Sequence, residues 1–228
     1  MSAVQWTTLS EVEPCPVQWL WESRIPCGKV TLLDGEPGSG KSHLALDLAA
    51  RVSRGLSMPL SRVKPTGAGN VLLFNDDDSL ADTVRPRLES AGADLGRIHC
   101  FDGEINAAEI LERKPALIIL DPLSVYLGLT CGDRDASPRL GLKKLTQLAR
   151  DTNAAVLAVQ YLPKEGSWAG EVFDVARSVL FISNIGHGRH RIALTKSNLR
   201  APNEIPPFVY NIERNGELVK ITGWADSV

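Results

Sequence analysis

The sequence predicts an α/β fold in which a mainly parallel central sheet is flanked by helices and extended by antiparallel C-terminal strands. Three observations lead to this prediction. Short runs of consecutive apolar residues, typical of strands covered on both faces, alternate with segments of helical periodicity. A phosphate-binding motif lies between the first of these strands and the first helix. From Ser178 onward, strand-like runs follow one another with no helix between them.

The predicted elements follow one another along the chain in a regular order. Core strands are expected at residues 29–33, 70–74, 97–101, 116–120 and 154–160. Helices are expected between them at residues 41–54, 79–91, 107–113 and 137–152. Pro86 falls inside the second helix and should kink it or delay its start, because proline lacks the backbone N–H. The C-terminal strands are expected at residues 179–182, 191–195, 208–212 and 219–222.

Composition excludes several classes of protein. The chain has 228 residues, of which 43% are hydrophobic and 23% charged, close to the averages for globular proteins. Its formal net charge of -2 provides no global basic field, so any contact with nucleic acid must be local. The longest apolar runs are far shorter than the ~20 residues that a membrane-spanning helix needs. We therefore expect no association with a membrane.

Cysteine usage indicates a reducing compartment. The four cysteines are widely spaced, without a C-x-x-C pair or histidines at ligand spacing: Cys15, Cys27, Cys100 and Cys131. Glu11 and Glu13 lie in an N-terminal stretch that has no continuous apolar segment, which argues against a signal peptide. A cytoplasmic protein is expected.

The residues Gly35 to Ser42 read G-E-P-G-S-G-K-S and match the P-loop pattern G-x-x-x-x-G-K-[ST]. Glycines allow the backbone N–H groups to turn toward phosphate oxygens, and the following helix adds its positive end. Lys41 is expected to contact the β and γ phosphates, and the Ser42 hydroxyl to ligate Mg²⁺. The expected nucleotide-binding residues are Glu36, Pro37, Gly38, Ser39, Gly40, Lys41, Ser42 and His43. The side chain of His43 is expected to pack as an ordinary helix residue. ATP and Mg²⁺ are the predicted cofactors.

Asp121 ends the apolar run Leu117-Ile118-Ile119-Leu120. By itself an apolar run ending in Asp-Pro is weak evidence, because this dipeptide also begins turns. With a P-loop upstream, Asp121 becomes the expected second residue of the magnesium site.

The predicted strand at residues 70–74 is followed by Asn75 and then by three consecutive acids, Asp76, Asp77 and Asp78. Asp77 is the candidate general base that orients the attacking water toward the γ phosphate. The same stretch is also expected to cap the next helix through Asp78 or Ser79, and the two roles can coexist.

Several strings extend the pattern beyond these motifs. They are Trp19-Leu20-Trp21, Arg24-Ile25-Pro26, Gly28-Lys29, Leu80-Ala81-Asp82-Thr83, Arg85-Pro86-Arg87-Leu88, Leu120-Asp121-Pro122-Leu123 and Thr195-Lys196-Ser197-Asn198-Leu199. Together with the P-loop, they resemble the RecA-like "AAA family ATPase" group that includes the RepA-type plasmid replicative helicases. The resemblance implies a RecA core, ATP hydrolysis at subunit interfaces, and a homo-oligomeric ring, commonly a hexamer, that acts on single-stranded DNA.

The resemblance covers the chain from Trp19 to Trp224. We therefore expect a single RecA-like ATPase domain over residues 1–228. Within it, residues 1–18 form an N-terminal extension, 19–177 the nucleotide-binding core and 178–228 a C-terminal β extension.

The chain departs from the family pattern at three places, one of which is the loop Leu162 to Gly170, usually Gly-rich and basic. Where the family has a catalytic Glu, Asp77 is one methylene shorter, which favours slow hydrolysis. The family's Arg-His pair that senses the γ phosphate is replaced by Gln160 and Tyr161. Gln160 can still hydrogen-bond a phosphate or a water, whereas Tyr161 lacks a comparable charge.

Lys196 and Arg200 lie in the only long stretch of the C-terminal region that carries several cations and no acid, residues 185–200. The resemblance implies that a Lys or Arg from this region reaches the γ phosphate of a neighbouring subunit. The alternative is a solvated turn cation. Interfacial ATP or DNA is the expected anionic partner of this stretch.

The leading hypothesis is an oligomeric ATPase that works as a motor or remodelling factor in DNA replication or recombination, with helicase activity left open. The alternative is a regulatory or assembly module that binds ATP and hydrolyses little of it. A small-molecule P-loop kinase is a third interpretation, which would require an arginine-bearing lid. Trp19 and Trp21 stand before the P-loop strand, where they either stack near the adenine or pack in the core.

Overall fold

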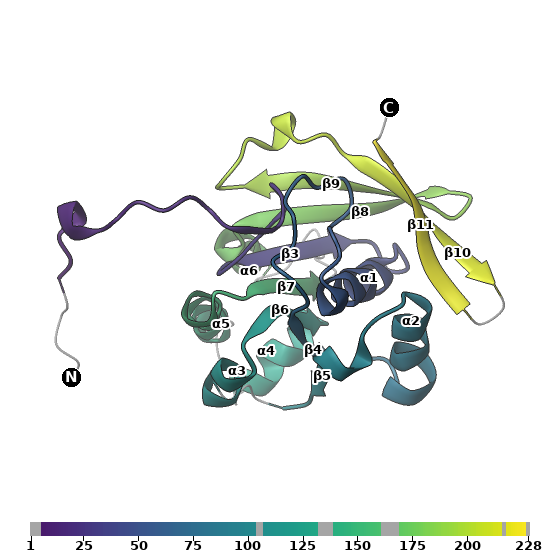
Figure 1. Cartoon of the computed structure of the whole chain (residues 1–228), viewed down its shortest axis with the longest axis horizontal. Helices are drawn as coiled ribbons and strands as arrows, with labels where there is room; N and C mark the ends of the chain where they lie inside the picture. The colour runs from purple at the N-terminus through teal and green to yellow at the C-terminus, as the bar shows by residue number, and fades with distance from the viewer. Residues whose placement is uncertain (1–5, 104–106, 132–138, 161–168, 216–217, 227–228) are drawn as a thin grey trace.

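The computed structural model describes residues 6–103, 107–131, 139–160, 169–215 and 218–226. Within these residues the chain forms one nine-stranded sheet and one two-stranded hairpin, with helices on both faces of the large sheet (Figure 1). The strands are β1 (Trp19–Trp21), β2 (Ile25–Pro26), β3 (Val30–Gly35), β4 (Asn70–Asn75), β5 (Ile98–Phe101), β6 (Pro115–Asp121), β7 (Ala155–Gln160), β8 (Ser178–Gly186), β9 (Arg189–Ser197), β10 (Phe208–Asn215) and β11 (Leu218–Asp226). The α-helices are α1 (Lys41–Arg54), α2 (Arg85–Ser90), α3 (Ala107–Arg113), α4 (Leu123–Cys131), α5 (Arg139–Thr152) and α6 (Ala169–Val175).

The large sheet has the order β11-β10-β9-β8-β3-β7-β6-β4-β5. Strands β8, β3, β7, β6, β4 and β5 pair in parallel, which confirms the predicted mainly parallel core. β8 also pairs antiparallel with β9, and β9, β10 and β11 continue antiparallel. The first C-terminal strand therefore belongs to both patterns, whereas the sequence predicted it as part of the antiparallel set.

The two faces of the central strands support separate hydrophobic layers. Leu33 packs with α1, α2 and the β1–β2 hairpin, whereas its neighbour Leu32 packs with α4, α5 and α6. This alternation follows from the two-residue period of a strand, and burial of both faces explains why these strands read as continuous apolar runs.

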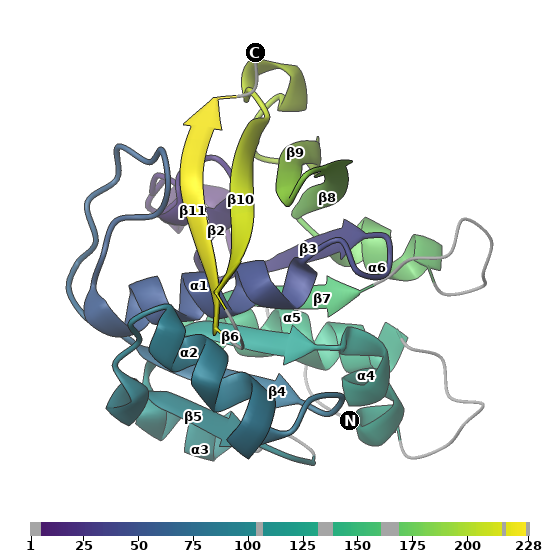
Figure 2. The same ribbon diagram turned by 90° about the vertical axis from the view of Figure 1, so that its right-hand side faces the viewer.

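The antiparallel strands do not simply lengthen the sheet. β10 and β11 cross beside α1 and α2, as the turned view shows (Figure 2). The C-terminal strands therefore reach the helix that follows the P-loop.

Pro86 has the predicted effect on the second helical segment. A π-helical turn at Leu80–Val84 comes first, and α2 begins at Arg85 with the proline in its first turn. The cap comes from Ser79, whose hydroxyl accepts a hydrogen bond from the backbone N–H of Asp82 at 3.5 Å. The predicted start of α5 at Ser137 lies outside the described residues, and the described part of that helix begins at Arg139.

Residues 6–16 extend away from the body of the protein before β1 (Figure 1). None of the described helices combines the length and apolar character that crossing a bilayer requires. Among the described cysteines, Cys15, Cys27 and Cys100 are free thiols.

Candidate nucleotide-binding site

The candidate site lies at the carboxyl edge of the parallel strands. Strand β7 separates β3 from β6, and the register aligns Asp34 at the end of β3 with Gln160 at the end of β7. In the same way, Asn75 at the end of β4 aligns with Asp121 at the end of β6. The sheet thus brings the P-loop, Gln160, Asp121 and the acidic stretch to one edge, where open α/β sheets bind their ligands.

The P-loop has a conformation that only glycine allows at its last turn. Gly40 has φ +91°, and a Cβ there would lie 2.6 Å from the Cδ1 atom of Ile212 on β10. Helix α1 begins at the next residue, Lys41, and no side chain caps its first turn. The uncapped N–H groups of α1 therefore provide donors for an anion such as a phosphate.

The Lys41 side chain folds back over the loop. Its ammonium donates hydrogen bonds to the carbonyl oxygens of Gly35 at 2.7 Å and Glu36 at 2.9 Å. Burial lowers the pKa of Lys41, and the negative charges of Asp34 and Asp121 raise it. The ammonium is therefore held at the mouth of the loop, where β and γ phosphates would meet it.

Ser42 and Asp121 come together as the sequence predicted. The Ser42 hydroxyl lies beside the Asp121 carboxylate and favours its charged form. The pKa of Asp121 is raised, first by burial and further by the nearby charges of Asp77 and Asp78, while Ser42 and Lys41 lower it. A hydroxyl and a carboxylate in contact are the oxygen ligands that Mg²⁺ takes beside nucleotide phosphates, so these two residues fit the metal.

The three acids after β4 have different surroundings. The Asp78 carboxylate accepts a hydrogen bond from Arg87 on α2 at 2.7 Å. The Asp76 backbone N–H points to the carbonyl oxygen of Asp121 at 3.4 Å. Asp77 is exposed, yet its charge acts on Asp121, so it lies at the edge of the candidate site.

Gln160 is buried, with 8% of its surface exposed. Its Oε1 atom accepts a hydrogen bond from the backbone N–H of Ser124 at 2.9 Å, at the start of α4. The side chain therefore connects the strand beside the P-loop to α4. Tyr161, which follows Gln160 and replaces the second residue of the family's Arg-His pair, lies outside the described residues.

Lys196 and Arg200 do not lie at the P-loop of their own chain. In the register of the sheet, Gly35 aligns with Ile182 in the middle of β8, whereas Lys196 on β9 aligns with Val179 near the start of β8. The three residue steps from Val179 to Ile182 correspond to about 10 Å along the strand.

The Lys196 ammonium has local partners near the end of α6. It donates to the backbone carbonyl oxygens of Phe173 and Asp174 and lies 4.6 Å from the centre of the Phe173 ring. Arg200 is exposed.

Two residues outside the motifs clarify the surroundings of the site. Trp21 is fully buried against Phe208, with ring centres 5.4 Å apart, so it packs in the core and does not face a ligand.

His190 on β9 contacts the carbonyl oxygen of Ser39 in the P-loop through Nδ1 at 2.8 Å. Sequence reasoning missed His190, because a single histidine in a strand carries no motif. The side chain of His43 lies beside Leu46 and Ile221, between α1 and β11.

Comparison with known proteins identifies the family. Residues 1–167 match the family described as "AAA domain". The chain belongs to this family. The chain is 26% identical over 204 residues to the DNA repair protein RadA of Streptococcus pneumoniae, a match that covers 85% of this chain and 44% of that protein. The RadA protein of Bacillus subtilis is 25% identical over 190 residues, covering 79% of this chain and 39% of that protein.

The fold is similar to that of a KaiC-like protein from the archaeon Pyrococcus horikoshii. The two structures have a TM-score of 0.60 and 17% sequence identity over 90% of this chain and 100% of that one. This AAA domain chain spans less than half the length of the RadA proteins that it matches. The expected RecA-like P-loop ATPase fold is confirmed.

Proposed function

We propose that the protein binds Mg²⁺·ATP at the P-loop edge and hydrolyses it as a head-to-tail homo-oligomer that acts on single-stranded DNA. The observation that carries this proposal is the position of Ser42 next to Asp121, with the Lys41 ammonium held over the P-loop and its charge acting on Asp121. It supports a site in which a cation for the phosphates and two oxygen ligands for Mg²⁺ meet at one edge of the sheet.

Each residue of the edge has an assigned role. Lys41 exchanges its contacts with the loop carbonyls for the β and γ phosphates, whose charge it balances. Ser42 and Asp121 hold Mg²⁺, which supplies further charge stabilisation to the phosphates. Asp77 orients the attacking water, and Gln160 senses the γ phosphate from the strand between β3 and β6.

The oligomer follows from the position of the second set of cations. Lys196 and Arg200 lie on the C-terminal strands, away from the P-loop of their own chain. A heterologous contact brings one surface of a subunit against a different surface of the next, and a closing rotation gives a ring. In such a ring, for which we propose a hexamer, Lys196 and Arg200 complete the neighbour's site, as an arginine finger does.

DNA is the partner that the cationic stretch and the relatives favour. The stretch contributes Arg189, Arg191, Lys196 and Arg200. The matched RadA proteins are named DNA repair proteins. We therefore place the activity in DNA recombination or replication, as a motor or remodelling factor of which a RepA-type helicase is one form.

A second candidate function has its own support. Asp77 is shorter than the glutamate of related enzymes, and Gln160 already binds the N–H of Ser124. Both observations favour an assembly module that binds ATP and hydrolyses it slowly.

Light scattering with size-exclusion chromatography, with and without Mg²⁺·ATP, tests the oligomer, and ATP hydrolysis with and without single-stranded DNA tests the activity. We expect association with nucleotide and faster turnover with DNA, both lost in Lys41→Ala. A monomer that binds no ATP contradicts the proposal, and an oligomer that binds ATP without DNA-stimulated turnover favours the assembly module.

A further inference from the structure

A buried histidine from the C-terminal strands contacts the backbone of the P-loop. His190 on β9 has 5% of its surface exposed, and its Nδ1 atom lies 2.8 Å from the carbonyl oxygen of Ser39. A carbonyl oxygen only accepts, so Nδ1 is the protonated nitrogen and donates this hydrogen bond. Burial lowers the pKa of His190, which favours the neutral ring.

This hydrogen bond fixes the direction of one peptide group in the loop. In a trans peptide the carbonyl of one residue and the N–H of the next point in opposite directions. By holding the Ser39 carbonyl on the side of β9, His190 directs the Gly40 N–H to the opposite side, away from β9. In a P-loop, backbone N–H groups of the loop hold the nucleotide phosphates, so the direction of this N–H bears on phosphate binding.

The loop has little else to hold this peptide. Gly40 has no side chain and a positive φ, so the peptide before it can rotate at low cost. The Ser39 hydroxyl is buried but has no hydrogen-bond partner among the described atoms. The restraint therefore comes from outside the motif.

The ring of His190 is itself held by a series of aromatic contacts. It stacks on Tyr210 of β10 with ring centres 5.5 Å apart and an angle of 19° between the planes. Tyr210 lies 4.9 Å from Trp224 of β11, and the Arg51 guanidinium of α1 lies 5.6 Å from the Trp224 ring.

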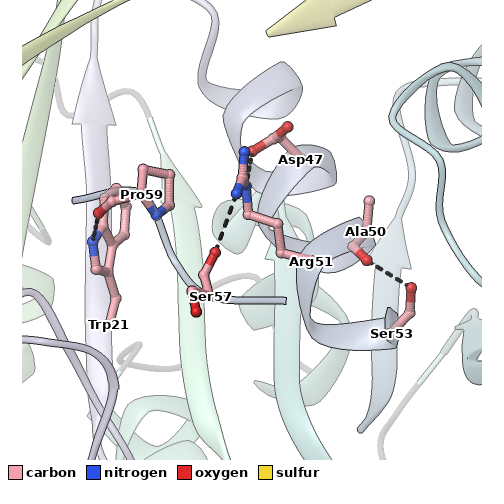
Figure 3. Close-up of polar contacts among 7 residues, drawn as sticks. All are labelled: Trp21, Asp47, Ala50, Arg51, Ser53, Ser57 and Pro59. Atoms are coloured by element: carbon pink, nitrogen blue, oxygen red, sulfur yellow. Dashed lines mark hydrogen bonds and ion pairs between the residues drawn. The ribbon is translucent and has the colours of Figure 1, made fainter. Parts of the chain in front are cut away.

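Arg51 is fixed in turn by Asp47 at 2.7 Å, within the same helix (Figure 3). The contacts thus lead from the P-loop through three C-terminal strands and back to α1, the helix that follows the P-loop. A displacement of these strands would move His190 relative to the loop.

We propose that His190 is a positioning residue for nucleotide binding and that the C-terminal sheet is a structural part of the nucleotide site. His190 fixes the orientation of the Ser39–Gly40 peptide group before the phosphate binds. This inference rests on the proposed binding of nucleotide at the P-loop.

Two substitutions separate the hydrogen bond from the stacking. His190→Asn places an amide N–H at the position of Nδ1 but removes most of the ring. His190→Phe keeps a ring against Tyr210 but removes the donor. Titration of each variant with Mg²⁺·ADP by calorimetry measures affinity, and the thermal shift that Mg²⁺·ADP induces separates binding from any general loss of stability.

We expect His190→Phe to weaken Mg²⁺·ADP about fivefold to tenfold, the range for a lost neutral hydrogen bond, and His190→Asn to remain within about twofold of the wild type. Tyr210→Phe is the matched control. It keeps the stacked ring and removes a buried hydroxyl that has no hydrogen-bond partner among the described atoms, so affinity should not change. If His190→Phe does not fold, His190→Gln is the second test, because its amide lies one bond too far along to replace Nδ1, and a similar loss is expected.

Wild-type affinity in His190→Phe or His190→Gln overturns the inference, and so does an Asn variant as weak as the Phe variant, since that assigns the effect to ring packing. Lys41→Ala separates this failure from that of the proposed function. If the wild type binds Mg²⁺·ADP and Lys41→Ala does not, the P-loop assignment stands whatever the His190 variants do. If the wild type does not bind, both are overturned.

Discussion

The parallel and antiparallel parts of the sheet contribute to the candidate site in different ways. The parallel strands contribute residues that follow strand ends, such as Lys41 after β3 and Asp121 at the end of β6. The antiparallel strands contribute residues from within strands, such as His190 on β9 and, in the proposed oligomer, Lys196 on the β9 strand of a neighbouring subunit. Strand-end residues belong to recognisable motifs, whereas residues within a strand depend on how distant segments pack. The same site therefore has one part that is local in sequence and one that is not.

The largest expected effect comes from the parallel part. Lys41→Ala removes the cation that the loop holds at its mouth, so ATP turnover should fall by at least ~100-fold. Steady-state ATP hydrolysis measures it, with Lys64→Ala, an exposed loop lysine, as the matched control. Unchanged turnover in the Lys41 variant would mean that the nucleotide binds elsewhere.

The next effect concerns the general base. Displacement of a catalytic group by about 1 Å can cost ~100-fold in rate, and complete loss of a base costs a similar factor. Asp77→Asn should therefore lower single-turnover hydrolysis ~100-fold with ATP binding intact, while Asp77→Glu preserves or raises it. Asp76→Asn, at an equally exposed neighbour, is the control and should stay active. A fully active Asp77→Asn protein would leave this stretch with its capping role alone.

The smallest expected effect is on thermal stability. The substitution Asp121→Asn should make the folded protein more stable even though it removes activity. Because the pKa of Asp121 is raised in the folded state, folding favours its protonated form, and that stabilisation is lost as the pH rises through the raised pKa. Asp121→Asn should then raise the Tm of the nucleotide-free protein at pH 7 by ~2 °C and abolish Mg²⁺-dependent turnover.

The difference in Tm should disappear below about pH 4, the usual pKa of an unfolded aspartate. Thermal unfolding of both proteins across this range measures it. A lower Tm at pH 7 would show that the favourable contacts of the charged carboxylate outweigh the cost of burying it.

The sequence predicted the parallel core because its strands read as apolar runs, and the helix over Lys41–Arg54 because its start is fixed by the P-loop and its end by Gly55. It did not predict α4, since Leu123–Cys131 is apolar around its whole circumference and lacks an amphipathic period. The short hairpin of β1 and β2 was missed because two- and three-residue strands carry almost no pattern.

The candidate site divides in the same way. The contact of Ser42 with Asp121 was predictable from two motifs, because parallel strands place their carboxyl ends at one edge. The contact of His190 with Ser39 was not, because it joins residues 151 positions apart through the crossing of β9 beside the loop. The place of Lys196 beside α6 was likewise beyond any local signal.

Hydrolysis by mixed oligomers tests most directly whether one subunit's C-terminal strands complete the next subunit's P-loop. Subunits with Lys41→Ala are mixed in equal amounts with subunits that carry both Lys196→Ala and Arg200→Ala. Each parent is expected to be inactive alone. Random head-to-tail assembly then gives about a quarter of the interfaces an intact P-loop facing intact cations, so about a quarter of wild-type turnover should return. No recovery on mixing, or full activity in the Lys196 and Arg200 variant alone, would contradict the account.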